Sequence, residues 1–335
     1  MHYKEHSDFQ LVRDGKPLER GESPVGDEAL NFLSEWRSSS STIQLQTSGS
    51  TGVPKAIEVD KSVMWHSASA TISALGLKSS IDVLLALSPQ YIAGKMMIVR
   101  ALQGGWRLHV HDLSTGVLNE IQRDFDFAAL VPLQVKGNAK LLNRICCTIL
   151  GGAPVDGELL AELNAVRTRV FETYGMTETV SHIALKQLRP SVDSAFRSVS
   201  GVTFSSNSNS ELVIHAPDWK QPELQTTDAV ELLDDTSFVW KGRSDFVINS
   251  GGVKIHPERV EPILTRLSGK SVYLTSRSDP KFGSKVIAIV EGDVPGLSRD
   301  ALLEEGLSIY EIPKEWRSVE AFPLTDSGKI KRLEL

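Results

Sequence analysis

The sequence predicts an α/β protein, with a large N-terminal domain of mixed sheets flanked by helices and a small α+β C-terminal domain. Short apolar runs alternate with helix-like stretches through the first two thirds of the chain, which is typical of parallel strands joined by crossover helices. Alternating segments then indicate antiparallel strands, and a short pattern of helix and strands closes the chain. The 335 residues are enough for about two or three compact domains.

Apolar runs bounded by turn residues predict buried strands in the N-terminal part. These runs are VLLALS (83–88), FAALVP (127–132), CCTILGGAP (146–154) and RVFETYG (169–175). Residues 155–167 follow a Gly-Ala-Pro turn and are predicted to form a crossover helix. Between about residues 196 and 240, the segments ELVIHA, AVELLD and SFVWKG predict hairpins, with the polar SSNSNS stretch (205–210) as a solvated turn.

A second α+β pattern begins after Arg243, so we predict domains at 1–243 and 244–335. The segment PERVEPILTRL is predicted to be a helix, with Pro257 in its first turn. The segments SVYLTS and KVIAIVEG are predicted to be strands. No internal repeat or heptad array is present in the sequence.

Charge and hydropathy exclude several classes of protein. The net charge is −6, and the Lys and Arg residues are spread along the chain, so no nucleic acid or anionic membrane is expected as a partner. The first residues lack the apolar core of a signal peptide, and Lys95 and Arg100 interrupt the longest apolar stretch, so no membrane span is expected. We expect a cytoplasmic protein, and the sequence leaves a homo-oligomer open.

The cysteines, Cys146 and Cys147, are adjacent and have no His or further Cys at the spacing of metal ligands. This excludes a zinc site. The pattern favours two small buried strand residues over a vicinal disulfide used for redox control.

The strongest local signal is the loop TSGSTGVPK (47–55), which follows a predicted strand, TIQLQ. Glycine lets the backbone approach an oxyanion, the hydroxyl groups donate hydrogen bonds, and the lysine adds positive charge. The loop is not a Walker A motif, because Val-Pro follows its last glycine. The predicted phosphate contacts are Thr47, Ser48, Gly49, Ser50, Thr51, Gly52 and Lys55.

Together with further motifs in a fixed order, this loop resembles the adenylate-forming superfamily of acyl-CoA ligases, luciferases and peptide-synthetase adenylation domains. The resemblance covers about residues 43–332. The further motifs are GGAP (151–154), YGMTE (174–178), TD (227–228), GRSD (242–245), GGVK (251–254) with Pro257 and Glu261, and PLTDSGK (323–329).

The resemblance implies a nucleotide site for ATP. Glu178, together with Thr177, would act in catalysis, and Glu178 would hold the Mg²⁺ that bridges the phosphates, since hard oxygen ligands suit that ion. An aromatic ring would face adenine, and a carboxylate would accept the ribose hydroxyls. The nucleotide-binding residues implied outside the loop are Gly152, Ala153, Pro154, Tyr174, Gly175, Asp228 and Arg243.

The resemblance also implies a two-step reaction with coenzyme A as co-substrate. The acid attacks the α-phosphate of ATP with loss of pyrophosphate, and a thiol then releases AMP. Lys329 would offset the charge of the two anions during the first step. The small domain would pivot at Asp245, so that Gly251 and Gly252 line the channel for the pantetheine arm in the second step.

Arg100 is the most informative residue for the identity of the acid. A guanidinium in the apolar run MMIVRAL is costly to bury unless an anion meets it, and a protein carboxylate is the alternative to a substrate. The chain resembles o-succinylbenzoate CoA ligases of menaquinone biosynthesis in this arginine, and their substrate carries a second carboxylate. Tyr91, Gly94, Ser181 and His182 are the implied pocket neighbours, and Lys95 is the rival cation.

Two features depart from the resemblance. An aromatic-His pair usually precedes the pocket glycine, whereas this chain has Gln90-Tyr91, and only 46 residues precede the phosphate loop, which predicts a reduced first subdomain. The alternatives are a ligase for another aryl or dicarboxylic acid, a stand-alone adenylation domain that loads a carrier protein, and a nucleotide-binding relic. The intact Glu178, Asp228 and Lys329 argue against the relic.

Overall fold

The computed structural model describes residues 3–46, 56–199, 201–217, 219, 221–279 and 283–323. The chain divides into two compact units, of which unit 1 comprises Met1–Val202 and Pro217–Lys220, and unit 2 comprises Thr203–Ala216 and Gln221–Leu335. The fold is a mixed α/β architecture, as the sequence predicts. The predicted boundary between residues 243 and 244 lies inside unit 2 and stays a prediction about domain movement.

Unit 1 is built on a largely parallel sheet with strand order β2-β1-β6-β5-β7-β8-β9-β10-β11. Its strands are β1 (Gln10–Arg13), β2 (Lys16–Pro17), β5 (Asp82–Leu85), β6 (Arg107–Val110), β7 (Phe125–Leu130), β8 (Ile145–Leu150), β9 (Arg169–Gly175), β10 (His182–Arg189) and β11 (Phe196–Ser198). Strands β1, β6, β5, β7, β8 and β9 pair in parallel, whereas β2, β10 and β11 are antiparallel to their neighbours. The predicted parallel strands are thus confirmed.

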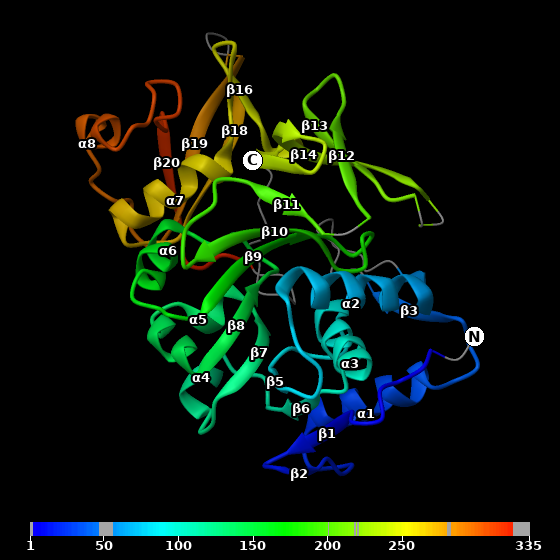
Figure 1. Cartoon of the computed structure of the whole chain (residues 1–335). Coiled ribbons are helices and arrows are strands. Elements are labelled where there is room, and N and C mark those ends of the chain that lie inside the picture. The colour runs from blue at the N-terminus through cyan, green and yellow to red at the C-terminus, as the bar shows by residue number, and fades with distance from the viewer. Residues whose placement is uncertain are drawn as a thin grey trace. The chain divides into compact units, whose positions relative to one another are not determined.

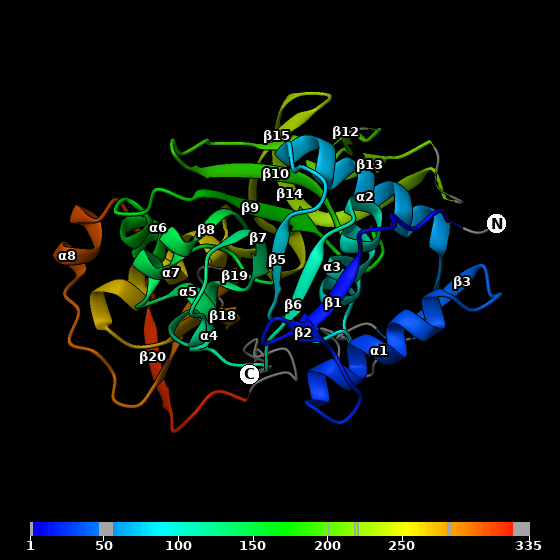
Figure 2. The ribbon, with the colours of Figure 1, turned by 60° about the horizontal axis from the view of Figure 1, so that its bottom comes forward.

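Helices cover both faces of this sheet (Figures 1 and 2). One face carries α1 (Pro24–Trp36), α2 (Lys61–Leu75) and α3 (Ile92–Gly104), and the other carries α4 (Val117–Glu120), α5 (Pro132–Val135), the 3₁₀ helix η1 (Ala139–Arg144) and α6 (Gly157–Leu163). The predicted helix at 155–167 is confirmed as the shorter α6. It starts where the Asp156 side chain accepts the Leu159 N–H, which caps the helix.

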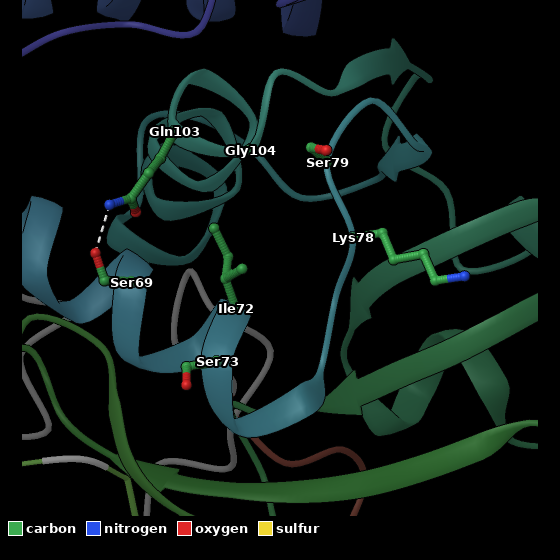
Figure 3. Close-up of a pocket in the computed structure, with 7 residues that line it drawn as sticks. All are labelled: Ser69, Ile72, Ser73, Lys78, Ser79, Gln103 and Gly104. Carbon is green, nitrogen blue, oxygen red and sulfur yellow. Dashed lines mark hydrogen bonds between the residues drawn. The ribbon is translucent and has the colours of Figure 1, made fainter.

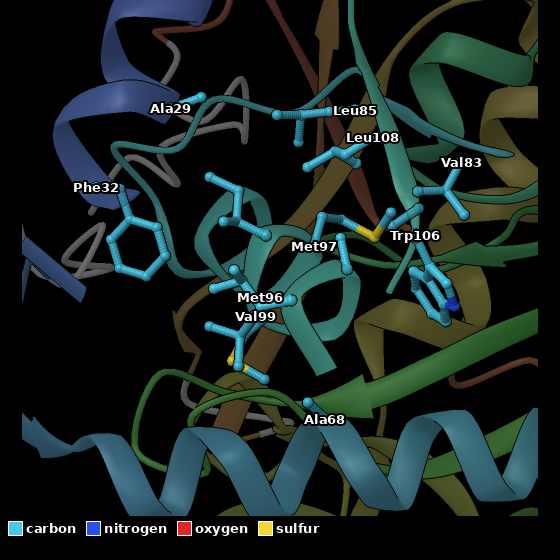
Figure 4. Close-up of a cluster of buried hydrophobic side chains, with 14 of the residues drawn as sticks. Ala29, Phe32, Ala68, Val83, Leu85, Met96, Met97, Val99, Trp106 and Leu108 are labelled. Atoms are coloured by element: carbon cyan, nitrogen blue, oxygen red, sulfur yellow. The ribbon is translucent and has the colours of Figure 1, made fainter. Parts of the chain in front are cut away.

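The central strands are apolar on both faces because each face meets a layer of helices. Val83 and Leu85 of β5 belong to the cluster packed with α1, α2 and α3, whereas Leu84 between them belongs to the cluster packed with α4, α5 and α6. Figure 4 shows part of the first cluster, with Met97 of α3 and Trp106 among its members. Double-sided burial therefore explains the continuous apolar runs in the sequence.

The predicted strand TIQLQ is confirmed as β3 (Thr42–Gln46), which pairs with β4 (Ala56–Asp60) in an antiparallel hairpin. In this register the Cα of Gln46 lies opposite that of Ala56. The segment 47–55 thus joins two neighbouring strand ends, while the loop itself lies outside the described residues.

The prediction that both cysteines are buried is wrong for one of them. Cys147 is buried, whereas Cys146 is exposed near the start of β8. Thr148, which points to the same face as Cys146, is fully buried, so this face is uncovered only at the start of the strand. Both thiols are free. Burial raises the pKa of the Cys147 thiol to about 11, which keeps it protonated and unreactive at neutral pH.

Unit 2 contains the predicted hairpins and a second sheet. The hairpin strands are β12 (Thr203–Ser206), β13 (Glu211–His215), β14 (Glu223–Asp234) and β15 (Ser237–Arg243), each antiparallel to the next. The second sheet has the order β17-β16-β19-β18, with β20 parallel to β19. Its strands are β16 (Ile248–Ser250), β17 (Val253–Ile255), β18 (Val272–Asp279), β19 (Gly283–Glu291) and β20 (Glu315–Val319).

The helices of unit 2 are η2 (Ser244–Phe246), α7 (Pro257–Ser268) and α8 (Arg299–Glu304). As predicted, α7 starts at Pro257, where the missing N–H is not needed. Its buried Val260 and Leu264 pack with Leu274 and Val286 of the second sheet. No helix in the described part of the chain is long and apolar enough to cross a membrane.

Candidate active site

The most unusual feature of unit 1 is a fully buried arginine. Arg100 lies on α3 with only 1% of its surface exposed. Its Nη2 donates to Ser181 Oγ at 2.7 Å, and its Nη1 lies 3.9 Å from Met97 Sδ. Its Nε has no hydrogen-bond partner among the described residues. The guanidinium is therefore held in place with part of its donor capacity unused.

Arg100 also has no carboxylate partner in the part of the chain that the structure describes. Burial alone lowers the pKa of Arg100, to about 9, so the side chain remains a cation at neutral pH. Burying an unpaired ion costs several kcal/mol even after relaxation. Such a cost is expected where an anion completes the site.

His182, the first residue of β10, lies beside this cation. Its Nε2 is 3.1 Å from Thr71 Oγ1 of α2, and its Nδ1 is 3.5 Å from Ser181 Oγ. Burial, and secondarily the charge of Arg100, lowers the pKa of His182 well below its usual value. The imidazole is thus neutral and can exchange hydrogen bonds without adding charge.

The rival cation, Lys95, has protein partners of its own. Its Nζ lies 3.9 Å from Glu35 Oε2 and 4.7 Å from the ring centroid of Phe32, both on α1. Burial lowers the pKa of Lys95, and the nearby Glu35 and Glu28 oppose this shift. Because Lys95 already meets a carboxylate and an aromatic face, Arg100 is the better candidate to receive an anion.

Tyr91 and Gly94 define the start of α3. Tyr91 is its N-terminal flanking residue and is 40% exposed. A Cβ on Gly94 would lie only 2.3 Å from the backbone oxygen of Ser88. Glycine is needed there because the chain that enters α3 runs directly over the first turn of the helix.

A tight loop between β9 and β10 carries the predicted Thr177 and Glu178. Thr179 fixes this loop, since its Oγ1 accepts the Met176 N–H at 2.9 Å. A Cβ on Gly175 would lie 2.4 Å from the backbone oxygen of Ser181, so the two strands can approach only at a glycine. The loop thus connects the predicted catalytic pair to Ser181, which contacts Arg100.

Glu178 itself is exposed at the tip of this loop. Within the described residues, no group of three His, Cys, Asp or Glu side chains is arranged to hold a metal ion. A single exposed carboxylate fits Mg²⁺ that is bound mainly through nucleotide phosphates and water, as this ion prefers.

The predicted adenine-binding segments lie at the ends of neighbouring parallel strands. The turn Gly152–Pro154 follows β8 and is exposed, and Gly152 has φ +82°. Tyr174 lies near the end of β9, half buried, with its ring 5.8 Å from that of Phe196. The carboxyl ends of parallel strands are where α/β sheets bind ligands.

Unit 2 holds the predicted ribose contacts. Asp228 of β14 is 6% exposed, and its Oδ1 accepts the Trp240 Nε1–H at 3.0 Å. Arg243 lies directly opposite Asp228 in the strand register. The Arg243 guanidinium forms a two-point pair with Asp245, at 2.9 and 2.7 Å, so the predicted ribose contact and the predicted pivot are joined.

Gly251 and Gly252 form the turn between β16 and β17, with φ +61° and +79°. Unit 2 also contains a pocket of about 470 Å³ that begins at Ser250, directly before this turn. Its lining combines two cations with apolar and aromatic groups. The lining residues are Ser250, Arg299, Ile309, Tyr310, Ile312, Pro313 and Lys314.

Sequence reasoning missed this pocket because its residues come from separate short segments without a motif. It also missed Thr71, whose contact with His182 joins residues far apart in the chain. The predicted phosphate-loop residues Thr47, Ser48, Gly49, Ser50, Thr51, Gly52 and Lys55, and the predicted catalytic Lys329, lie outside the described residues.

Unit 1 has a pocket of about 310 Å³ between α2, α3 and the segment that follows α2. Figure 3 shows Gln103 bonded to Ser69 on one side, whereas the Lys78 ammonium points away from them. None of the predicted site residues lines this pocket. Without a charged group directed inward, it is a weaker candidate than the surroundings of Arg100.

Known proteins resemble this chain in sequence and in fold. The model of the family described as AMP-binding enzyme matches residues 6–208. A 2-succinylbenzoate–CoA ligase of Listeria monocytogenes serotype 4b (strain F2365) is 26% identical over 340 aligned positions, covering 92% of this chain and 72% of that protein.

Solved structures extend the likeness over most of the chain. A Dyadobacter fermentans DSM 18053 protein, described as acyl-CoA synthetase (AMP-forming)/AMP-acid ligase II-like, is 33% identical with a TM-score of 0.63, covering 93% of both chains. The o-succinylbenzoate CoA synthetase of Bacillus subtilis, solved with its acyl-adenylate intermediate, is 22% identical with a TM-score of 0.75. The match covers 86% of this chain and 67% of that one, and at this identity it shows the fold alone.

Proposed function

The chain belongs to the family of AMP-binding enzymes, and from this premise we propose that it is an ATP-dependent o-succinylbenzoate CoA ligase of menaquinone biosynthesis. The observation that carries the choice of acid is the buried Arg100, which has no carboxylate partner among the described residues. The ring carboxylate of o-succinylbenzoate would complete this site. The names of the similar ligases support the same substrate.

In the proposed reaction, the succinyl carboxylate attacks the α-phosphate of ATP, and pyrophosphate leaves. The thiol of CoA then attacks the acyl carbon, and AMP leaves. Mg²⁺ supplies charge neutralisation at the phosphates when bound. Arg100, Ser181 and His182 orient the acid, so that its reacting carboxylate is presented in one geometry.

We assign the remaining roles on the same basis. Asp228 and Arg243 bind the ribose, Tyr174 and the 151–154 turn bind adenine, and Glu178 holds Mg²⁺. Lys329 promotes adenylation, and the phosphate contacts are Thr47, Ser48, Gly49, Ser50, Thr51, Gly52 and Lys55. We further propose that residues 244–335 move as a domain about Asp245, and that the enzyme acts in the cytoplasm.

The unit 2 pocket supports CoA as the thiol substrate. Arg299 and Lys314 present positive charge beside the exposed ring of Tyr310 and next to the Gly251–Gly252 turn. Phosphates and a purine are what such a surface would bind. A stand-alone adenylation domain would discharge its adenylate to a carrier protein and not to free CoA, which separates the two alternatives.

Comparing two acids in the wild-type protein and in Arg100→Met tests the proposal. We expect wild type to release pyrophosphate with o-succinylbenzoate at a kcat/KM at least about 30-fold above that for 4-oxo-4-phenylbutanoate, which lacks the ring carboxylate. In Arg100→Met this preference should disappear, because the cation that distinguishes the acids is gone. Robust turnover of another acid by wild type without turnover of o-succinylbenzoate would end the assignment.

A further inference from the structure

In unit 2, the start of α7 is tied to the end of β15 through one carboxylate. The backbone N–H of Arg243 donates to Glu258 Oε1 at 3.2 Å. Glu258 is the second residue of α7 and follows Arg243 by 15 positions. An acidic residue in the first turn of a helix interacts favourably with the helix dipole. That interaction does not require the carboxylate to contact a neighbouring strand.

Glu258 approaches β15 most closely beside Gly242, where no side chain occupies the space. Gly242 has φ +129°, and a Cβ there would lie 2.7 Å from Glu258 Oε2 and 3.4 Å from His256 Nδ1. Both polar atoms therefore face the same α-carbon. A Cβ at position 242 would crowd the Glu258 carboxylate, which would have to shift, whereas His256 Nδ1 would be in ordinary contact.

These two atoms are also unsatisfied. Glu258 Oε2 and His256 Nδ1 are buried and have no hydrogen-bond partner among the described residues. An ionised carboxylate only accepts hydrogen bonds, and so does the unprotonated nitrogen of a neutral imidazole. Leaving such atoms buried without partners is costly, so the contact is not one that maximises stability.

The hydrogen bond between Arg243 and Glu258 joins residues on either side of the predicted pivot, Asp245. Arg243 precedes Asp245 and Glu258 follows it, and the Arg243 side chain pairs with Asp245 itself. If the residues after Asp245 turn relative to those before it, the bond between Glu258 and the Arg243 N–H has to break. The bond therefore stabilises one setting of the pivot over others.

We propose that Glu258 is a positioning residue that ties Arg243 to α7 across Asp245 and so sets the balance between acyl-adenylate formation and thioester formation. The kinetic part of this inference rests on the proposed function. The tie itself is a property of the chain and can be measured without any substrate.

Hydrogen exchange at the Arg243 amide in the full-length chain tests the tie. We expect exchange about 10-fold faster in Glu258→Ala, which removes the acceptor. Glu258→Gln keeps an acceptor for the Arg243 N–H and can place an amide N–H toward His256 Nδ1, so its exchange should equal the wild-type rate or be slower. Glu305→Gln is the matched control, because Glu305 pairs with Arg266 after the pivot, and it should leave the rate unchanged.

The two half-reactions, measured separately, test the kinetic role. Adenylation is followed by exchange of labelled pyrophosphate into ATP with o-succinylbenzoate, and thioester formation by the decay of preformed acyl-adenylate with CoA. Glu258→Ala should change the ratio of the two rates about 5-fold or more, and Glu258→Gln should restore it.

Unchanged exchange at the Arg243 amide in Glu258→Ala would overturn the tie. Faster exchange with an unchanged ratio, or with two rates that fall in parallel, would overturn the kinetic role. If wild type shows no adenylation of o-succinylbenzoate, the proposed function fails, while the amide exchange still decides whether the tie exists. The Leu274 N–H donates to Glu261 Oε1, and unaltered exchange of this amide verifies that each variant is folded.

Discussion

Burial of the Arg100 guanidinium costs free energy, and no carboxylate among the described residues compensates for it. Replacing a buried charged group by an apolar side chain of similar volume often stabilises a protein by about 1 to 4 kcal/mol. We therefore expect Arg100→Met to raise the free energy of unfolding in urea by an amount in this range, while it abolishes selection of the acid. Lys95→Met is the matched control and should give a smaller gain or a loss, since Lys95 has Glu35 and Phe32 as partners. Destabilisation by Arg100→Met would show that the protein already compensates this charge.

His182 should make stability depend on pH in a defined direction. Its pKa is lowered in the folded state, mainly by burial, whereas an unfolded histidine titrates near about 6.5. Below that pH the unfolded chain binds a proton that the folded chain does not, so the stability present above pH 6.5 falls as the pH decreases. Between pH 6.5 and 5, we expect the free energy of unfolding of wild type to fall more steeply than that of His182→Gln. The difference should be up to about 1.4 kcal/mol per pH unit. Urea unfolding at several pH values measures this difference, and parallel profiles would contradict it.

At the scale of elements, the sequence predicted the type of structure well where one environment covers a whole segment. The predicted run 127–132 overlaps strand β7, in which Phe127–Leu130 are all buried, so residues on both faces of the strand contribute to the apolar signal. Cys146 was predicted wrongly, because adjacency in sequence does not reveal that β8 has one exposed position near its start.

The candidate site divides in the same way. A charged residue inside an apolar run is visible in the sequence, so Arg100 could be predicted as a site residue. Ser181, which accepts its hydrogen bond, was predicted as a pocket neighbour from the resemblance. Thr71, by contrast, meets His182 across 111 positions of chain, and only the packing of α2 beside α3 and β10 brings it there. Long-range contacts of this kind have no periodic signal in a single sequence.

The first turn of α3 should be the element most sensitive to added volume. In Gly94→Ala the new methyl group would meet the Ser88 backbone oxygen, which cannot move aside like a flexible side chain. We expect a loss of about 1 to 3 kcal/mol in the free energy of unfolding. Gly157→Ala is the control, since nothing lies within 4 Å of a Cβ there, and it should be neutral or slightly stabilising. Equal effects of the two changes in thermal unfolding would contradict the predicted strain.

At the scale of the whole molecule, each unit has a hydrophobic core of its own. The clusters under α1–α3 and under α4–α6 consist of residues of unit 1, and the cluster under α7 consists of residues of unit 2. Units with separate cores can unfold as separate cooperative transitions. Ligands of the Arg100 site should then stabilise one transition, and ligands of the unit 2 pocket the other.

Calorimetry of two matched cavity variants tests this independence. Leu84 and Leu264 are both fully buried, the first in the sheet of unit 1 and the second on α7 of unit 2. Each Leu→Ala change should cost about 2 to 5 kcal/mol, because it removes apolar contact and leaves a cavity. We expect Leu84→Ala to lower the midpoint of one transition only and Leu264→Ala to lower the other only, with o-succinylbenzoate raising the transition that Leu84→Ala lowers. A single transition that both variants shift by the same amount would show that the two units unfold together.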